Sequence, residues 1–268
     1  MNAHKDTFRL QKRISHMSLN SAASTSIYSW NTVLNMKSYL LSMDKSIDRF
    51  NLSMERLLKA GFTNISKYRG LDAETDNLQS EWIKHGSPKF DPADPDFIAN
   101  KGKQACALGH YGIWADMIAN NIPYALVFED DVEFHKYWQV LAKEYWNATP
   151  KDFDLLYMGS QIESTAEGTV LRVPVYCTHA YMISLAGAKK LYELCVHNPA
   201  GTRTIDCIII DVMHNVCRNN ITNPPFSWYV WRATKFYDAN AHKKATLAKR
   251  NMGLIFQDAD IPSYIYQM

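Results

Sequence analysis

Ile122-Pro-Tyr-Ala-Leu-Val-Phe-Glu-Asp-Asp-Val-Glu-Phe134 joins a short apolar run to three consecutive acids. The run from Tyr124 to Phe128 is rich in residues that favour strands, and it stops abruptly at the first acid. This pattern predicts a buried central strand. Its acidic end is where ligands bind in open α/β sheets, outside the carboxyl ends of the strands.

The three acids Glu129, Asp130 and Asp131 need a partner of opposite charge. Adjacent carboxylates repel one another and lose hydration on partial burial, so a bound cation is the most economical explanation. Oxygen ligands suit Mg²⁺ or Mn²⁺, and Mg²⁺ is usually held by one or two carboxylates and by substrate phosphates. Acid runs are also common in solvated loops. Here Val132 and Phe134 continue the apolar pattern, which favours a metal or nucleotide site.

The composition bounds the class of protein. A chain of 268 residues that is 47% hydrophobic can form one large α/β domain or two small ones. The 29 basic and 27 acidic side chains provide no concentrated basic surface, which argues against nucleic acid as a partner. The five cysteines are widely spaced, odd in number and without a CxxC pair, so neither a disulfide framework nor a zinc site is expected.

The sequence shows no transmembrane segment or secretion signal. No apolar run approaches the roughly 20 residues that span a bilayer, and the first 25 residues lack the apolar core of a signal peptide. We therefore expect a soluble, cytoplasmic protein.

Apolar periodicity predicts a β-α-β opening, followed by further helices and strands. In the predicted opening helix the apolar positions share one face, and Gly61 ends the helix. The predicted strands are 39–41, 62–68, 124–128, 153–158, 170–176, 179–184, 226–230 and 253–256, and the predicted helices are 44–60, 104–120, 137–145, 186–196 and 204–217. Residues 75–102, which are polar and contain three prolines, are expected to form a long loop.

Four motifs occur in an order that resembles glycosyltransferase family 25, the group of lipooligosaccharide and collagen galactosyltransferases. Leu41-Ser-Met-Asp-Lys-Ser-Ile-Asp-Arg49 is similar to the family's opening signature, and Ala105-Cys-Ala-Leu-Gly-His110 matches its Gly-Cys-x-Leu-Ser-His. Phe128-Glu-Asp-Asp-Val132 matches without change. Thr178-His-Ala-Tyr-Met-Ile-Ser184, with Gly187-Ala-Lys-Lys190, resembles the downstream segment.

The resemblance implies a GT-A-type fold, in which a mostly parallel sheet flanked by helices binds a nucleotide sugar. Residues 1–37 are then an extension, and 38–268 form a single catalytic domain with a donor half at about 38–160 and an acceptor half at about 161–268. The implied activity is metal-dependent, inverting transfer of a hexose, above all galactose from UDP-galactose, to a glycan, lipooligosaccharide or glycoprotein hydroxyl. A bound Mn²⁺ or Mg²⁺ would offset charge on the departing UDP.

Asp131 is the favoured metal ligand, with Glu129 as its partner, because alternation along an extended chain places both on one side. Asp130 lies behind the metal or contacts the ribose. The candidate donor-binding residues elsewhere are Asp44, Arg49, Asp72, His110 and His179. Each has a structural alternative: Arg49 can pair with a neighbouring acid, and either histidine can be satisfied within the core.

An inverting transfer needs a base that accepts the proton of the acceptor hydroxyl. Asp206 is the candidate, with the N-cap of a helix as its alternative role, and Asp211 is held in reserve. Two other functions stay open. Ser42 and Gly109 replace the family's Asn and Ser, which is compatible with a nucleotide-sugar-binding protein that has lost catalysis. The second open function is that of a metal-dependent nucleotidyltransferase, although the chain has no P-loop.

Overall fold

The computed structural model of the chain describes residues 29–86, 99–161, 168–196, 204–219, 226–232 and 251–258. Its strands are β1 (Ser38–Met43), β2 (Ile65–Gly70), β3 (Tyr124–Glu129), β4 (Val132–Phe134), β5 (Leu155–Gln161), β6 (Val170–Leu171), β7 (Tyr176–Ser184), β8 (Trp228–Trp231), β9 (Asn251–Gly253) and β10 (Ile255–Gln257). Its helices are α2 (Trp30–Leu34), α3 (Ile47–Ala60), α4 (Leu78–Lys84), α6 (Lys101–Ala119), α7 (Trp138–Ala148), α8 (Leu185–Val196) and α9 (Ile205–Asn219).

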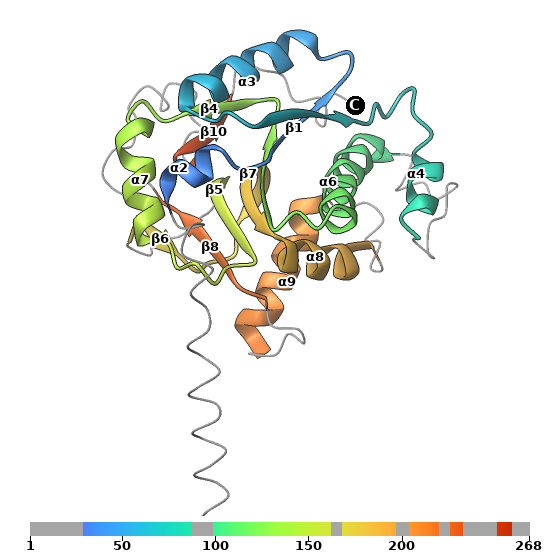
Figure 1. Ribbon diagram of the computed structural model, residues 1–268. Helices are drawn as coiled ribbons and strands as arrows, with labels where there is room; N and C mark the ends of the chain where they lie inside the picture. Colours follow the sequence, from blue (N-terminus) through green and yellow to red (C-terminus); the bar gives the residue numbers. More distant parts are fainter. Residues whose placement is uncertain are drawn as a thin grey trace, which may run out of the picture.

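An eight-stranded sheet forms the centre of the molecule, and helices cover both of its faces (Figure 1). The strand order is β2-β1-β3-β7-β5-β8-β6, with β9 paired to β5. Strands β2, β1, β3, β5 and β8 point the same way, and β7 runs antiparallel between β3 and β5. The predicted α/β class with a mostly parallel sheet is confirmed. The predicted β-α-β opening is also confirmed, because β1 and β2 are parallel and α3 connects them.

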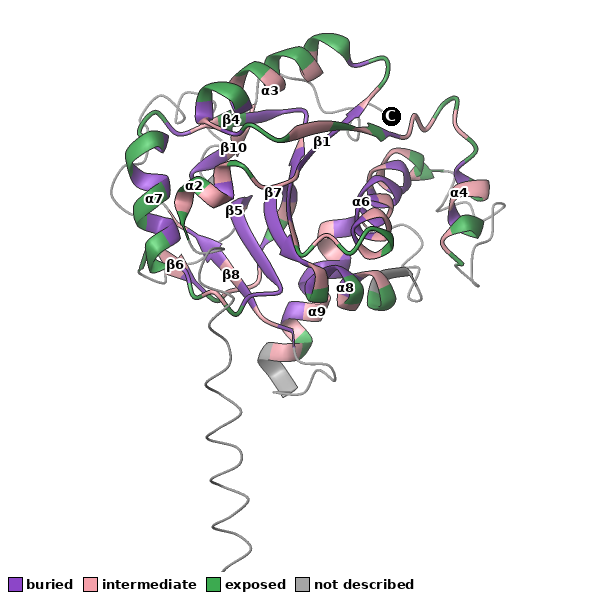
Figure 2. Ribbon diagram, in the orientation of Figure 1, coloured by how far each residue is buried: buried purple, intermediate pink, exposed green. Residues whose placement is uncertain are grey.

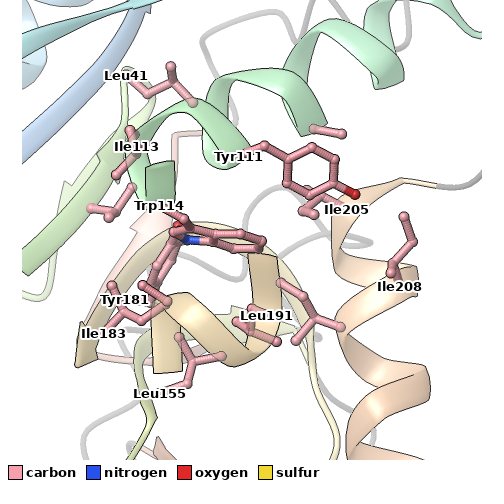
Figure 3. Packing of buried hydrophobic residues seen from close by; sticks show 14 of the residues in the cluster. Leu41, Tyr111, Ile113, Trp114, Leu155, Tyr181, Ile183, Leu191, Ile205 and Ile208 are labelled. Carbon is pink, nitrogen blue, oxygen red and sulfur yellow. The ribbon is translucent and has the colours of Figure 1, made fainter. Parts of the chain in front are cut away.

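Strand β3 separates two cores, since alternate residues of a strand point to opposite faces of the sheet. Ala125 and Val127 belong to the first core, which lies under α6, α8 and α9. Leu126 and Phe128 belong to the second core, which lies under α3 and α7. All four side chains are fully buried. Figure 3 shows the first core, which is filled by side chains from α6, β7, α8 and α9. The strand predicted from the apolar run is therefore a buried, interior strand of the sheet. The acids follow it at its carboxyl end.

Helix α3 ends where the sequence predicts, at Gly61, whose φ of 103° lies in the left-handed region that glycine tolerates best. Its predicted apolar face is only partly buried. Leu57 is fully buried, whereas Leu52 and Leu58 are 38% and 56% exposed. The outer sides of the helices are likewise exposed in Figure 2, with buried strands between them.

Two helices lie where the sequence did not predict them. Within the predicted loop 75–102, Leu78–Lys84 forms α4, so the loop prediction is wrong there; the side chain of Asn77 accepts a hydrogen bond from Ser80 N and caps the helix. Residues 87–98 lie outside the described residues. Helix α2 lies within the predicted extension and packs its Trp30 ring against three tryptophans of the second core.

None of the helices among the described residues is long and apolar enough to cross a membrane.

Candidate functional site

The acidic triplet lies on the turn between β3 and β4. The chain leaves β3 at Glu129 and turns at Asp130 and Asp131, so it is not extended through the triplet as predicted. Strand β4 then pairs with β10 in a separate two-stranded sheet. Because of this turn, each of the three carboxylates has different contacts, although both aspartates are only 6% exposed.

Glu129 points toward β7 and α6. Its Oε1 accepts a 2.8 Å hydrogen bond from the Thr178 hydroxyl and lies 3.3 Å from His110 Nε2. Burial alone would raise the pKa of Glu129, but the interactions with His110 and the hydrogen bond from Thr178 outweigh it and hold that pKa below its usual range. Glu129 is therefore a half-buried, negatively charged group.

His110 is fixed by a directed chain of hydrogen bonds. Trp114 Nε1 donates to the Tyr181 hydroxyl at 3.0 Å, and that hydroxyl lies 2.9 Å from His110 Nδ1. The charged Glu129 carboxylate can only accept, so the facing Nε2 carries a proton. The Tyr181 hydroxyl accepts from the indole N–H and can donate its own proton to Nδ1. His110 is therefore a buried histidine with hydrogen-bond partners in the core, and it also contacts Glu129 of the acidic triplet. Its predicted donor-binding role stays a prediction.

Asp130 is held by residues of β1 and α3, whereas the partners of Glu129 lie on α6 and β7. Its Oδ2 accepts a 2.7 Å hydrogen bond from the Ser42 hydroxyl, and its Oδ1 lies 2.5 Å from Arg49 Nη2. Burial nevertheless raises the pKa of Asp130 above its ordinary value. Arg49 therefore pairs with the acidic triplet rather than with its neighbour Asp48, and it also lies 3.8 Å from Asp131.

Asp131 has one oxygen without a partner. Its Oδ1 is buried and accepts no hydrogen bond from the described residues, and its Oδ2 lies 3.5 Å from Gln257 Nε2, the limit for a hydrogen bond. Burial and the charge of Glu129 raise the pKa of Asp131 to about 8. Buried polar atoms are normally satisfied, so an orphaned carboxylate oxygen fits the ligand set of a divalent cation. The residues present thus fit a hard metal ion at this edge.

The segment 251–258 closes one side of the triplet, and sequence reasoning missed this role. Asp258 N donates to the Asp131 carbonyl at 2.6 Å, and Arg56 of α3 holds the Asp258 carboxylate at 2.7 Å. Gln257 links Gln161 of β5, at 3.3 Å, to the Asp131 carboxylate. The only sequence signal was a faint family resemblance around Gly253 to Gln257.

Asp44 and Asp72 lie away from these contacts. Asp44 is exposed and pairs with Lys67 at 2.9 Å and Arg69 at 2.8 Å, and Asp72 pairs with Lys45 at 2.9 Å. Among the described residues, neither aspartate forms a hydrogen bond or an ion pair with the triplet. Their predicted donor-binding roles stay predictions.

His179 is tied to the C-terminal strand. Its Nε2 donates to the carbonyl of Ile255 at 3.1 Å, its Nδ1 is buried without a partner among the described residues, and burial lowers its pKa. Gly159 makes this approach possible, because a Cβ there would lie 2.0 Å from the Ile255 oxygen and 2.4 Å from His179 Nε2. His179 therefore positions β10 beside the acidic triplet.

Asp206 is the second residue of α9, so it lies in the first turn of the helix, two residues past the N-cap position. Its Oδ2 accepts a 3.1 Å hydrogen bond from Cys177 N, and its Oδ1 accepts one from Cys207 N at 2.8 Å. The residue after Cys177 is Thr178, whose hydroxyl donates to Glu129, so adjacent residues of β7 connect Asp206 to the acidic triplet. Asp211, more than one turn further along α9, is half-buried.

The chain is similar in sequence to known glycosyltransferases. The family model described as glycosyltransferase family 25 (LPS biosynthesis protein) matches residues 35–173. The Bos taurus protein named "Probable inactive glycosyltransferase 25 family member 3" is 33% identical over 102 residues, which cover 34% of this chain and 17% of that protein. "Procollagen galactosyltransferase 1-A" of Xenopus laevis is 36% identical over 104 residues, with the same coverage of 34% and 17%.

These matches span less than a fifth of the two relatives' own length. Among solved structures, a glycosyltransferase involved in the glycosylation of the major capsid of PBCV-1 aligns over 85% of this chain and 94% of that chain, with 10% identity and a TM-score of 0.45.

Proposed function

The chain belongs to glycosyltransferase family 25, and from this premise we propose that it is a metal-dependent, inverting transferase that moves galactose from UDP-galactose to a glycan or glycoconjugate hydroxyl. The observation that carries the proposal is the unpartnered, buried Oδ1 of Asp131, beside the charged Glu129. The relative named a procollagen galactosyltransferase supports galactose as the sugar. The family description as an LPS biosynthesis protein supports a lipooligosaccharide acceptor beside a glycoprotein one.

Asp131 and Glu129 would hold Mn²⁺ or Mg²⁺, ions that prefer oxygen ligands and bind substrate phosphates together with one or two carboxylates. When bound, the metal supplies positive charge that stabilises the departing UDP. The protein adds a second positive charge through Arg49, which lies within 3.8 Å of Asp130 and Asp131. Ser42 keeps the Asp130 carboxylate in place. Two fixed positive charges at the diphosphate are the arrangement that transfer from a nucleotide sugar requires.

Asp206 is the proposed base for the acceptor hydroxyl. Backbone N–H groups of Cys177 and Cys207 fix the orientation of its carboxylate, and the Thr204 hydroxyl also donates to Oδ1. Oδ2, which accepts only from Cys177 N among the described residues, has a further lone pair for a hydroxyl donor. An oriented carboxylate near the metal ligands can take the proton as the acceptor oxygen attacks the sugar. Asp211 remains the reserve candidate.

A catalytically impaired, nucleotide-sugar-binding protein is the second candidate, and a specific observation favours it. Several relatives, including the bovine one, are named inactive members of the family. In addition, Ser42 replaces the Asn of the family's opening motif, and its hydroxyl donates a hydrogen bond to Asp130 of the acidic triplet.

Two measurements separate the candidates. Isothermal titration of UDP with and without Mn²⁺ tests donor binding, and release of UDP from UDP-galactose with glycan acceptors tests turnover. Metal-dependent binding with turnover supports the transferase. Metal-dependent binding without turnover for any UDP-sugar supports the impaired protein, and no metal-dependent binding contradicts both.

A further inference from the structure

Cys106 and His110 lie one turn apart on α6 and face Glu129 at the end of β3. Three possible ligand atoms lie within 4.8 Å of one another: the sulfur of Cys106, a ring nitrogen of His110 and a carboxylate oxygen of Glu129. Spacing of four residues places the two α6 side chains on the same helix face. We propose that Cys106, His110 and Glu129 form a second cation site that binds Zn²⁺ and that shares Glu129 with the Mg²⁺ or Mn²⁺ site at Asp131.

The spacing of the two best-defined ligand atoms fits zinc. Zn–N bonds of about 2.0–2.1 Å and Zn–O bonds of about 2.0–2.2 Å at a tetrahedral angle separate the nitrogen and oxygen by roughly 3.3–3.5 Å. His110 Nε2 lies 3.3 Å from Glu129 Oε1. Zinc can therefore replace the proton that these atoms share while both side chains keep their places.

The chemistry of the ligands selects the metal. A thiolate, an imidazole and a carboxylate suit Zn²⁺, whereas Mg²⁺ and Mn²⁺ prefer oxygen ligands only. The Asp131 carboxylate and its neighbours provide oxygens without sulfur or nitrogen. Three protein ligands also leave the fourth tetrahedral position of zinc open, and Cys106 is half-buried, so a water molecule or small ligand can reach it.

Two of the proposed zinc ligands already have hydrogen-bond partners that fix their orientation. Tyr181 contacts His110 Nδ1 at 2.9 Å, and Thr178 donates to Glu129 at 2.8 Å. Metal-binding histidines almost always use their second nitrogen in this way, which fixes the ring. With zinc on Nε2, the neutral ring carries its proton on Nδ1 and donates it to the Tyr181 oxygen. The two lone pairs of that oxygen then accept from His110 and from Trp114 Nε1, and the Tyr181 hydroxyl proton turns away from the ring. The Cys106 thiol releases its proton to solvent, since only the thiolate binds.

Zinc binding has a consequence for the proposed reaction, because Glu129 serves both sites. Zinc that occupies Glu129 withdraws it from the Mn²⁺ site, so Zn²⁺ inhibits Mn²⁺-dependent transfer. This consequence rests on the proposed function. The binding of zinc does not, and a chain without transferase activity would still bind it.

Cobalt is the probe of choice, because Co²⁺ occupies zinc sites and a cobalt–thiolate bond absorbs in the near ultraviolet. Titration of the full chain with Co²⁺ should produce this charge-transfer band, and Zn²⁺ should abolish it. Cys106→Ser should remove the band and weaken Zn²⁺ binding by more than the roughly 10- to 100-fold that loss of an outer-shell partner costs. Cys207→Ser is the matched control and should keep the band.

Asp131→Asn separates the two sites. It should keep the cobalt band but lose Mn²⁺-dependent UDP binding, so failure of the proposed function leaves the zinc site testable. A wild-type chain without the band, or a Cys106→Ser chain that retains it, would overturn the zinc proposal.

A second measurement needs no variant. Alkylation of Cys106 in the wild-type chain, followed by mass spectrometry, should slow by at least about tenfold when Zn²⁺ is present, given the affinity expected of such a ligand set. Unchanged alkylation of Cys106 with Zn²⁺ would contradict the proposal even if Cys106→Ser failed to fold.

Discussion

Ser42 Oγ donates a 2.7 Å hydrogen bond to Asp130 Oδ2 across 88 positions of sequence, and both residues are buried. The bond joins the end of β1 to the turn after β3, two parallel neighbours in the sheet. Because parallel strands bring their carboxyl ends to one side of the sheet, the contact connects the first strand of the sheet to the acidic triplet.

Ser42→Ala should lower the free energy of unfolding by about 1.5–3 kcal/mol, the value of a hydrogen bond to a charged group. Ser53→Ala is the control, because the Ser53 hydroxyl is fully buried without a partner among the described residues. That change should be nearly neutral or stabilising. Urea unfolding of both variants checks the prediction, and equal losses would show that the Ser42 bond contributes nothing specific.

Asp131→Asn should abolish Mn²⁺-dependent UDP binding and leave the fold intact, since it removes a charged ligand but almost no packing volume. At pH 7 the metal-free variant should be about as stable as the wild type, because a carboxyl with a pKa of about 8 is then mostly protonated and the amide replaces a neutral group of similar size. Isothermal titration with circular dichroism tests this. Wild-type metal affinity in the variant would remove Asp131 from the metal site.

Asp206→Asn should reduce transfer by about 10²- to 10⁴-fold, because an amide cannot accept the acceptor proton. UDP affinity should survive. The single oxygen of Asn can accept only one of the two backbone hydrogen bonds that Asp206 accepts, from Cys177 N and from Cys207 N, so circular dichroism should accompany the assay to check that α9 still forms.

Asp211→Asn is the matched variant for the same assay. Normal turnover in Asp206→Asn together with lost turnover in Asp211→Asn would transfer the role of base to Asp211.

The pH dependence of stability should include a contribution from His179, whose pKa is lowered by burial. In the unfolded chain this histidine titrates near its usual value of about 6.5. Its contribution to stability is therefore present above that pH and is lost as the pH falls through the folded pKa. The loss is about 1.4 kcal/mol for each unit that separates the two pKa values.

His179→Gln tests this contribution, because its amide can still donate to the Ile255 carbonyl but cannot gain a proton. Urea unfolding at pH 7, 6 and 5 should show a smaller loss of stability in the variant than in the wild type. Parallel pH profiles would exclude His179 as the source.

Local patterns determined the central strand, the β-α-β opening and the acids at the sheet edge. Each depends on residues close in sequence: an apolar run for β3, a glycine after α3, and carboxylates directly after the strand. Local patterns failed at α4, where the prolines and polar residues of 75–102 suggested a loop. Burial of Leu78 and Trp82 against the first core stabilises a helix there.

The partners of the site residues were decided by the tertiary structure alone. Spacing within the sequence argued against a zinc site because no two cysteines are close together, yet folding brings Cys106 and His110 of one helix to Glu129 of a strand. In the same way β10 pairs with β4 and places Gln257 beside Asp131, across 126 positions. Periodicity records which face of an element is buried. It carries no information about which distant element covers that face, since that is set by the packing of the whole chain.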